Sequence, residues 1–273
     1  MDSKRLTIVL LVLALFTGAT IEISEGSVYN GIVLFLAAMI LFTRLPLAGF
    51  TSLRYSKLYI LAGLFIVIAD VIYNFSTNNS LGTLDTMVFF LGLSLVALGL
   101  ENQQIQRLGE FGAYISSTFI VLFLIFYIIF GKLNIDFLHV FDHYFILLPT
   151  VKVLEIIGIP VEIIATETVR LQGVEDMTIV IGGPCSGLYS MFLLIGIIFG
   201  YSRVEKLDYK MSLFILGLSI FIAYISNLFR VVVLYLTAYI YGQETMMMVH
   251  THLGWIIFAV IAAAIIRFIE LKK

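Results

Sequence analysis

The fold is decided by the stretch Met211–Tyr241, MSLFILGLSIFIAYISNLFRVVVLYLTAYIY, in which Arg230 is the only charged residue. A helix needs about 20 mostly apolar residues to cross a hydrocarbon core of about 30 Å. This stretch therefore predicts a transmembrane helix, and other stretches of the chain have the same character. The eight predicted spans are Leu6–Ile23, Val28–Thr43, Leu58–Phe75, Thr86–Leu100, Gly112–Phe130, Ser186–Tyr201, Met211–Tyr241 and Thr251–Ile269.

The composition of the whole chain is that of a membrane protein. Of its 273 residues, 61% are hydrophobic and 12% are charged, and the mean hydropathy is +1.07. Because soluble domains carry about 25% charged residues, these values exclude an ordinary soluble enzyme and a disordered chain. The formal net charge of -2 provides no basic surplus, so we expect no nucleic-acid partner. A single cysteine excludes an internal disulfide and a cysteine-cluster metal site.

The distribution of lysine and arginine predicts the orientation. When the N-terminus is placed inside, twelve of the 16 basic residues fall on inner segments. Only Lys132, Lys152 and Arg170 fall on outer segments, and Arg230 lies within a span. By the positive-inside rule we expect a multi-pass protein of the cell membrane with both termini in the cytoplasm.

These features predict an all-α polytopic membrane protein that forms one domain over residues 1–273. Its N-terminal part, residues 1–130, contains five predicted transmembrane helices. Residues 131–184 form an extracellular insertion before the sixth span, and residues 185–273 form a C-terminal part with three helices.

The insertion contains a predicted helix and a predicted β-hairpin. Its apolar stretch Phe145–Ala165 is interrupted by Pro149 and Pro160, which indicates a helix at the membrane interface rather than a ninth span. Alternating residues in Thr168–Leu171 and Met177–Ile181 predict the two strands of a small hairpin. This hairpin delivers the chain to the start of the sixth span.

Polar residues that the bilayer should reject are the best guide to function in a membrane protein. Cys185 follows Gly182-Gly-Pro at the predicted start of the sixth span. A helix N-terminus stabilises a thiolate, which is the nucleophilic form of cysteine. A free cysteine is more often a small buried apolar residue. Packing alone, however, requires neither the glycine-proline approach nor the pair Ser186 and Gly187 that follows.

Arg230 is the second polar residue of this kind. The helix from Lys210, at the inner interface, to Arg230 spans about 30 Å, which places Arg230 near the outer boundary at the level of Cys185. Asn227 lies three residues before Arg230 and on the same helix face. The alternative role for Arg230 is that of an anchor whose charged end reaches the interface.

His250 is the third, at the predicted outer end of the eighth span. His252 follows on a different helix face, and Trp255 is typical of an interfacial aromatic belt, so an interfacial role remains an alternative for either histidine. The remaining histidines, His139 and His143, show no clear ligand spacing. We therefore expect no metal site and no cofactor.

Three separate spans thus bring a thiol, a guanidinium and an imidazole to one depth of the bilayer. A thiol beside an imidazole has the logic of a cysteine nucleophile with its general base. A fixed guanidinium can stabilise the oxyanion of a tetrahedral intermediate. The combination predicts cysteine-dependent acyl transfer at the outer face of the membrane.

The sequence resembles the exosortase/archaeosortase family of membrane transpeptidases in three ordered motifs. The family pattern is Cys-x-Gly, then Asn-x-x-Arg, then His-x-x-x-Gly. The chain has Cys185-Ser-Gly, Asn227-Leu-Phe-Arg230 and His250-Thr-His-Leu-Gly254. The spacing to Gly254 selects His250, rather than His252, as the histidine of the family pattern.

The resemblance implies an activity on proteins that carry a C-terminal sorting signal, made of a short motif, a transmembrane helix and a basic tail. Cys185 would attack the scissile carbonyl and form a thioester, His250 would transfer the protons, and Arg230 would hold the oxyanion. Asn227 would orient Arg230, and the neighbours Ser186 and Gly187 would support the cysteine. The new C-terminus would pass to an amine acceptor, which the resemblance implies to be a membrane lipid.

Three other functions remain open from the sequence. A transporter could use Asp70 in the third span and Arg230 in the seventh, although the chain shows no internal repeat of the kind many transporters have. A structural subunit would leave the aligned thiol, guanidinium and imidazole unexplained. A plain cysteine protease would use the same residues and resolve the thioester with water instead of an amine.

Overall fold

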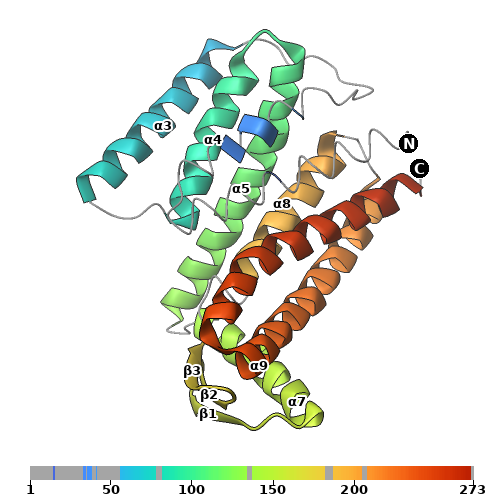
Figure 1. Ribbon diagram of the computed structural model, residues 1–273. Coiled ribbons are helices and arrows are strands. Elements are labelled where there is room, and N and C mark those ends of the chain that lie inside the picture. Colours follow the sequence, from blue (N-terminus) through green and yellow to red (C-terminus); the bar gives the residue numbers. More distant parts are fainter. Residues whose placement is uncertain are drawn as a thin grey trace. The chain divides into compact units, whose positions relative to one another are not determined.

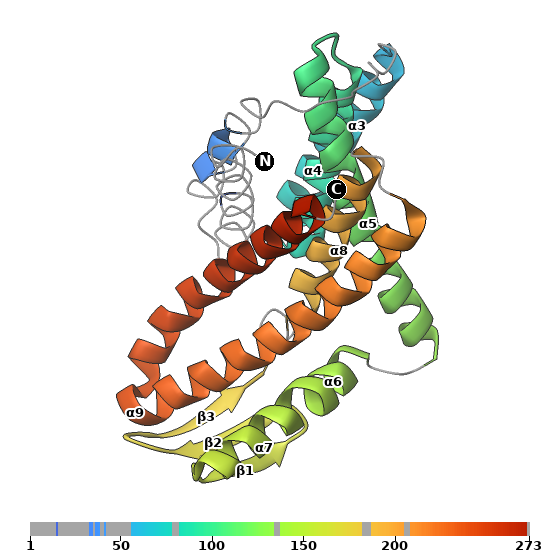
Figure 2. The same cartoon turned by 90° about the vertical axis from the view of Figure 1, so that its right-hand side faces the viewer.

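A computed structural model of the chain describes residues 56–77, 82–133, 137–181, 187–204 and 208–271, with a few helical positions before residue 42. The first two predicted spans lie largely outside the described residues. Figures 1 and 2 show that the described chain consists mostly of helices, with one small sheet. The predicted helical membrane protein with a small β insertion is therefore confirmed in its class. The count of eight spans stays a prediction.

The long helices lie where the apolar stretches predict them. They are α3 (Lys57–Thr77), α4 (Thr83–Gly99), α5 (Gln103–Lys132), α8 (Leu188–Val204) and α9 (Tyr209–Leu271). Among the described residues, three segments are long and apolar enough to cross a bilayer, in α3, in α5 and in α9 as far as His250. The apolar segments of α4 and α8 are shorter.

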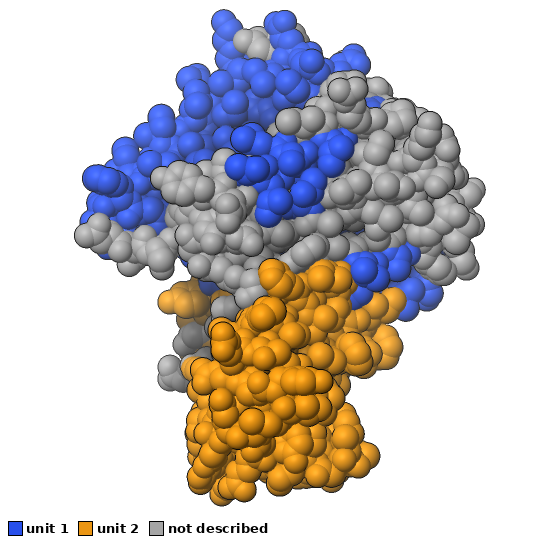
Figure 3. All heavy atoms as spheres, viewed as in Figure 1, with its two compact units in different colours: residues 1–123, 192–219, 258–273 blue, residues 124–191, 220–257 orange. Residues whose placement is uncertain are grey.

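The chain forms two compact units, which Figure 3 distinguishes by colour. Unit 1 comprises residues 1–123, 192–219 and 258–273, and unit 2 comprises residues 124–191 and 220–257. Unit 2 contains most of the predicted insertion, the start of α8 and the middle of α9. It therefore contains the described positions of all three sequence motifs.

In unit 1, small residues bring the helices into close contact. A Cβ atom on Gly63 of α3 would lie 2.5 Å from the carbonyl oxygen of Gly92 in α4. A Cβ atom on Gly109 of α5 would lie equally close, at 2.5 Å, to the carbonyl oxygen of Ser94. Such glycine contacts let helix backbones approach where the bilayer provides no hydrophobic driving force for association.

The insertion in unit 2 begins with three consecutive helical segments. They are α6 (Phe137–Phe141), the π-helix η1 (Asp142–Leu147) and α7 (Leu148–Ile157). The predicted helix over Phe145–Ala165 is thus wrong at both ends. Pro149 lies at the start of α7, directly after the π-helix η1, and the helical run continues through it.

The helix ends before residue 160 for a local reason. Gly158 has a φ of 89° and caps α7 in the left-handed conformation that glycine adopts most readily. The N–H of Ile159 donates to the carbonyl of Leu154 at 3.0 Å, which completes the cap. The chain then leaves as strand β1 (Val161–Ala165), which the sequence pattern alone did not indicate.

The sheet is antiparallel with the strand order β1-β2-β3. Strands β2 (Thr168–Gln172) and β3 (Asp176–Val180) form the predicted hairpin, which is confirmed, and β1 adds a third strand. Alternate side chains of β2 and β3 are buried, as the period of two requires: Val169, Leu171 and Met177.

Helix α9 contains a break that replaces the expected loop between the seventh and eighth spans. At Gly242 the backbone leaves the helical region, with φ 85° and ψ 179°, and the helix resumes at once. Figures 1 and 2 show α9 turning back on itself at one end of its first half. Because φ is positive here, glycine is the residue that adopts this conformation without strain.

Candidate functional site

The two halves of α9 meet at Arg230 and Gly254. Arg230 is only 9% exposed, and a Cβ atom on Gly254 would lie 3.1 Å from its Nη1 atom. Arg230 lies twelve residues before the break at Gly242, and Gly254 lies twelve residues after it. At about 1.5 Å per residue, both positions are about 18 Å from the break, which is why the returning helix brings them together.

His250 lies on the same side of the returning helix as Gly254, one turn closer to the break. Its side chain is half-buried, and the charge of Arg230 acts on its imidazole. His252 is exposed. The structure therefore brings together two of the three groups that the sequence predicts for the site, the guanidinium of Arg230 and the imidazole of His250.

Asn227 contacts the start of α8. Its side chain is 8% exposed, and a Cβ atom on Gly187 would lie 2.4 Å from its Cγ atom. Gly187 also has a φ of 77°, and its carbonyl accepts the N–H of Met191 at 2.9 Å as α8 begins. Glycine at 187 is thus required both by the backbone conformation and by the space that Asn227 occupies.

Cys185 and Ser186 lie outside the described residues. Gly187 and Ile181 are the described residues that bound this segment of the chain. The roles predicted for Cys185, Arg230 and His250, with Asn227 in support, therefore stay predictions.

The break in α9 is held by the turn between β2 and β3. The N–H of Val174 donates to the carbonyl of Tyr239 at 3.0 Å, just before the break. The N–H of Gln243, just after the break, donates to Oε2 of Glu175 at 3.3 Å. A Cβ atom on Gly173 would lie 2.5 Å from the Tyr239 carbonyl oxygen, so glycine permits this approach.

The sequence analysis missed this contact between the hairpin and α9. A signal was present, since Gly173 lies between the two strands of the predicted hairpin and Gly242 directly follows the apolar stretch Met211–Tyr241. Nothing in the sequence, however, pairs the two glycines. Beside the turn, Arg170 in β2 forms an ion pair with Asp176 in β3 through two hydrogen bonds. This hydrogen bonding to Arg170 lowers the pKa of the Asp176 carboxyl group from its usual value.

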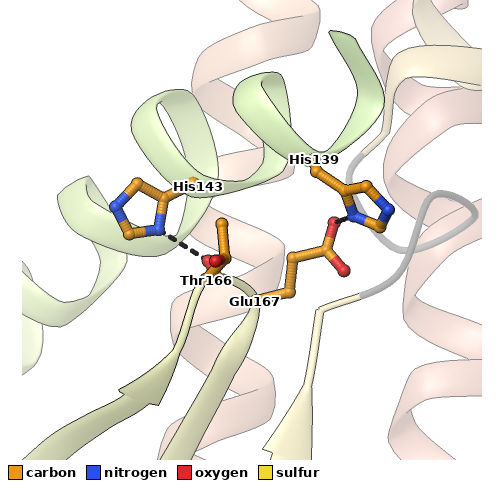
Figure 4. A network of polar contacts seen from close by, with 4 residues as sticks. All are labelled: His139, His143, Thr166 and Glu167. Carbon is orange, nitrogen blue, oxygen red and sulfur yellow. Dashed lines mark hydrogen bonds and ion pairs between the residues drawn. The ribbon is translucent and has the colours of Figure 1, made fainter. Parts of the chain in front are cut away.

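His139 and His143 join the helical part of the insertion to the turn between β1 and β2, as Figure 4 shows. His139 pairs with the carboxylate of Glu167. Nδ1 of His143 donates to the carbonyl oxygen of Thr166 at 2.6 Å. The carbonyl of Glu167 in turn accepts the N–H of Ile181 at 2.9 Å.

The contacts of these two histidines are therefore structural ones. They hold the turn between β1 and β2 in place. This turn contains Glu167, whose carbonyl accepts the hydrogen bond from Ile181, the residue before Gly182. In the described part of the chain, no three His, Cys, Asp or Glu side chains gather in a way that could hold a metal ion.

One further polar residue of the insertion was not singled out from the sequence. Asp142, at the start of the π-helix η1, is 1% exposed, and its charge acts on the hydroxyl of Tyr189 in α8. Tyr189 is the fourth residue after Cys185. Short π-helices occur often at functional sites. The sequence did not indicate this carboxylate, because nothing in the residues around Asp142 shows that its side chain is buried.

Comparison with known proteins gives one match. Residues 21–267 match the family described as transmembrane exosortase, which covers most of the chain and includes all three motifs from Cys185 to Gly254. No curated protein and no solved structure matches the chain.

Proposed function

This chain belongs to the transmembrane exosortase family of membrane cysteine peptidases and transpeptidases, and we propose that it cleaves and transfers C-terminal sorting signals through Cys185. Its substrates would be surface proteins that end in a short motif, a transmembrane helix and a basic tail. The reaction would take place at the outer face of the cell membrane, with both termini of the enzyme in the cytoplasm. The acceptor of the new C-terminus would be the amine of a membrane lipid.

The observation that carries this proposal is the contact between the two halves of α9. It brings the guanidinium of Arg230 and the imidazole of His250 into one neighbourhood. A charged side chain within an apolar membrane helix is costly and rare, so the buried position of Arg230 needs a reason. Stabilising the negative oxygen of a reaction intermediate is such a reason.

The start of α8 connects this neighbourhood to the chain's one cysteine. Asn227, one turn before Arg230 on α9, contacts Gly187, and Gly187 is two residues after Cys185. Two residues of chain span at most about 7 Å, whatever their conformation. Connectivity therefore supports a thiol that works together with Arg230 and His250.

In the proposed reaction, His250 removes the proton from the Cys185 thiol, and the sulfur attacks the scissile carbonyl carbon. The tetrahedral intermediate carries its negative charge on the carbonyl oxygen, where Arg230 stabilises it. As the intermediate collapses, the peptide C–N bond breaks, and the leaving amine takes the proton from His250. The acceptor amine then attacks the thioester and transfers a proton to His250, the C–S bond breaks, and His250 passes that proton to the sulfur, which restores the free thiol and the neutral imidazole.

A candidate substrate with a C-terminal sorting signal tests the proposal when it is co-expressed with the wild type or with Cys185→Ala. We expect a shortened product with added lipid mass from the wild type alone. A shortened product without added mass would show that water resolves the thioester and that the protein is a protease. Processing by Cys185→Ala would overturn the assignment of the nucleophile.

Because Cys185 is the only cysteine, its reactivity can be measured without a substrate. The rate of alkylation by iodoacetamide against pH reports when the thiolate forms. We expect its midpoint to rise in His250→Gln and to stay unchanged in the control His252→Gln. The opposite pattern would mean that His252 is the base.

A further inference from the structure

The break in α9 leaves backbone groups that ordinary helical hydrogen bonds do not satisfy. A helix end carries unpaired carbonyls and a helix start carries unpaired N–H groups. At Gly242 both ends face the turn Gly173–Glu175, which donates a backbone N–H to Tyr239 and accepts the N–H of Gln243 with a carboxylate. One short turn of the insertion thus satisfies one backbone group on each side of the break.

We propose that Glu175 is a positioning residue, which holds the returning half of α9 so that His250 faces Arg230. This inference rests on the proposed function. The carboxylate of Glu175 lies at the N-terminus of the returning helix, where a negative charge is favoured by the helix dipole. It lies 3.2 Å from the position that a Cβ atom on Gly242 would take, so it contacts the point about which the helix turns.

Geometry explains why a contact this far from His250 affects it. His250 lies eight residues beyond Gly242, or about 12 Å along the returning helix. A rotation of that helix about Gly242 by a few degrees moves the imidazole of His250 by about 1 Å. Misplacements of about 1 Å between reacting groups can reduce a rate by about 100-fold.

The strand that follows Glu175, β3, also leads toward the segment that contains Cys185. From Glu175 the chain continues as β3 to Ile181, whose N–H is bound by the Glu167 carbonyl at 2.9 Å. Ile181 is the fourth residue before Cys185. One sheet therefore holds the helix that carries the proposed base at one end and the segment that leads to the proposed nucleophile at the other.

The neighbouring residue Asp176 provides a matched control. It is also an exposed carboxylate, at the first position of β3, but its partner is Arg170 in β2 rather than α9. The variants are Glu175→Ala, which removes the contact, Glu175→Gln, which keeps an acceptor of the same shape, and Asp176→Asn. Each is made in the full-length protein and tested for processing of the sorting-signal substrate and for alkylation of Cys185 against pH.

For Glu175→Ala we expect kcat to fall by about 10- to 100-fold while KM changes little. We also expect its alkylation midpoint to move toward that of His250→Gln. Glu175→Gln should recover most of kcat, and Asp176→Asn should behave as the wild type. A wild-type kcat in Glu175→Ala would overturn the inference, as would a loss of kcat that leaves the alkylation midpoint unchanged.

Hydrogen exchange separates a failure of this inference from a failure of the proposed function. If His250→Gln alters neither processing nor alkylation, the proposed roles fail and the amides still report on the break. Faster exchange of the amides at 240–248 in Glu175→Ala than in Asp176→Asn would show that Glu175 holds the returning helix. Equal exchange in the two variants would show that it does not.

Discussion

Gly254 lies directly against the guanidinium of Arg230, so that a Cβ atom at position 254 would be 3.1 Å from Nη1 and 3.4 Å from Cζ. The distance to Nη1 is tighter than ordinary van der Waals contact. The absence of a side chain at 254 therefore sets how closely the returning half of α9 approaches the buried arginine. This contact explains the spacing His-x-x-x-Gly, because Gly254 leaves room for Arg230 one helical turn from His250.

The first prediction follows from this contact. Gly254→Ala should displace the guanidinium by a few tenths of an ångström and lower kcat by about tenfold, because the oxyanion then loses its best geometry. Gly217→Ala in the first half of α9 is the control, since a Cβ atom there meets nothing within 4 Å. Processing rates of the two variants at equal protein level in the membrane provide the measurement. Equal rates would show that the contact has no part in the reaction.

The second prediction concerns Gly187, where alanine meets two obstacles. It would adopt a φ of 77° and place its Cβ atom within 2.4–2.7 Å of the Asn227 amide. At Gly158 only the first obstacle exists, because the space around its Cβ position is empty within 4 Å. Gly158→Ala should therefore cost about 1–2 kcal/mol of stability from the left-handed backbone alone, and Gly187→Ala clearly more.

Thermal unfolding of both variants in detergent measures the difference. The double variant Gly187→Ala with Asn227→Ala removes the clash and leaves the backbone cost, so its midpoint should approach that of Gly158→Ala. If Gly187→Ala is as stable as Gly158→Ala, the contact with Asn227 is not tight.

The third prediction tests the geometry of the Arg230 side chain. Arg230→Lys keeps the positive charge but loses the planar fork of donors, so we expect a loss of processing of at least about 100-fold. Arg203→Lys is the matched control, because Arg203 lies in α8 over the ring of Phe199, at 5.1 Å from its centroid. We expect that variant to process its substrate at nearly the wild-type rate. Wild-type activity in Arg230→Lys would reduce Arg230 to a membrane anchor.

The fourth prediction concerns how the stability that the Arg170–Asp176 pair gives to the protein depends on pH. Hydrogen bonding to Arg170 lowers the pKa of Asp176 in the folded protein, whereas the unfolded value is about 3.9. The stabilisation is therefore fully present above about pH 4 and disappears as the pH falls through the lowered folded value. The wild type should be more stable than Asp176→Asn at pH 7, by a small margin because the pair is exposed. The margin should vanish at the lowest pH where the protein still folds, as followed by thermal unfolding of both proteins.

Much of the helical framework was predictable, because hydrophobicity along a chain is a local property. The stretch Met211–Tyr241 indicates a membrane helix by its composition alone, and α9 contains it whole. The hairpin β2–β3 was also predictable, since the alternation of its side chains is visible over five residues. The helix predicted over Phe145–Ala165 was wrong in its bounds, because it begins before residue 145 and Gly158 ends α7 early. A left-handed cap depends on a backbone conformation that a count of apolar residues does not contain.

For the site, the sequence indicated which residue types to examine, and the roles of Cys185, Arg230 and His250 stay predictions. The sequence placed Arg230 and His250 at one depth from the lengths of two helices. It did not indicate that Gly254 would touch Arg230, or that Asn227 would occupy the space beside Gly187.

The sequence by itself thus determined the membrane class, the positions of the long helices that the structure describes, the hairpin and the family motifs, each read from a local pattern of residues. Only the tertiary structure decided that α9 breaks at Gly242 and that Glu175 holds the break from 68 residues away. The physical reason is that the break is held by groups distant from it in the chain, the backbone N–H of Val174 and the side-chain carboxylate of Glu175. Glu175 and Asp176 are both acidic residues beside one predicted turn, and their sequence does not distinguish them. Only the folded chain shows that the carboxylate of Glu175 contacts the start of the returning helix.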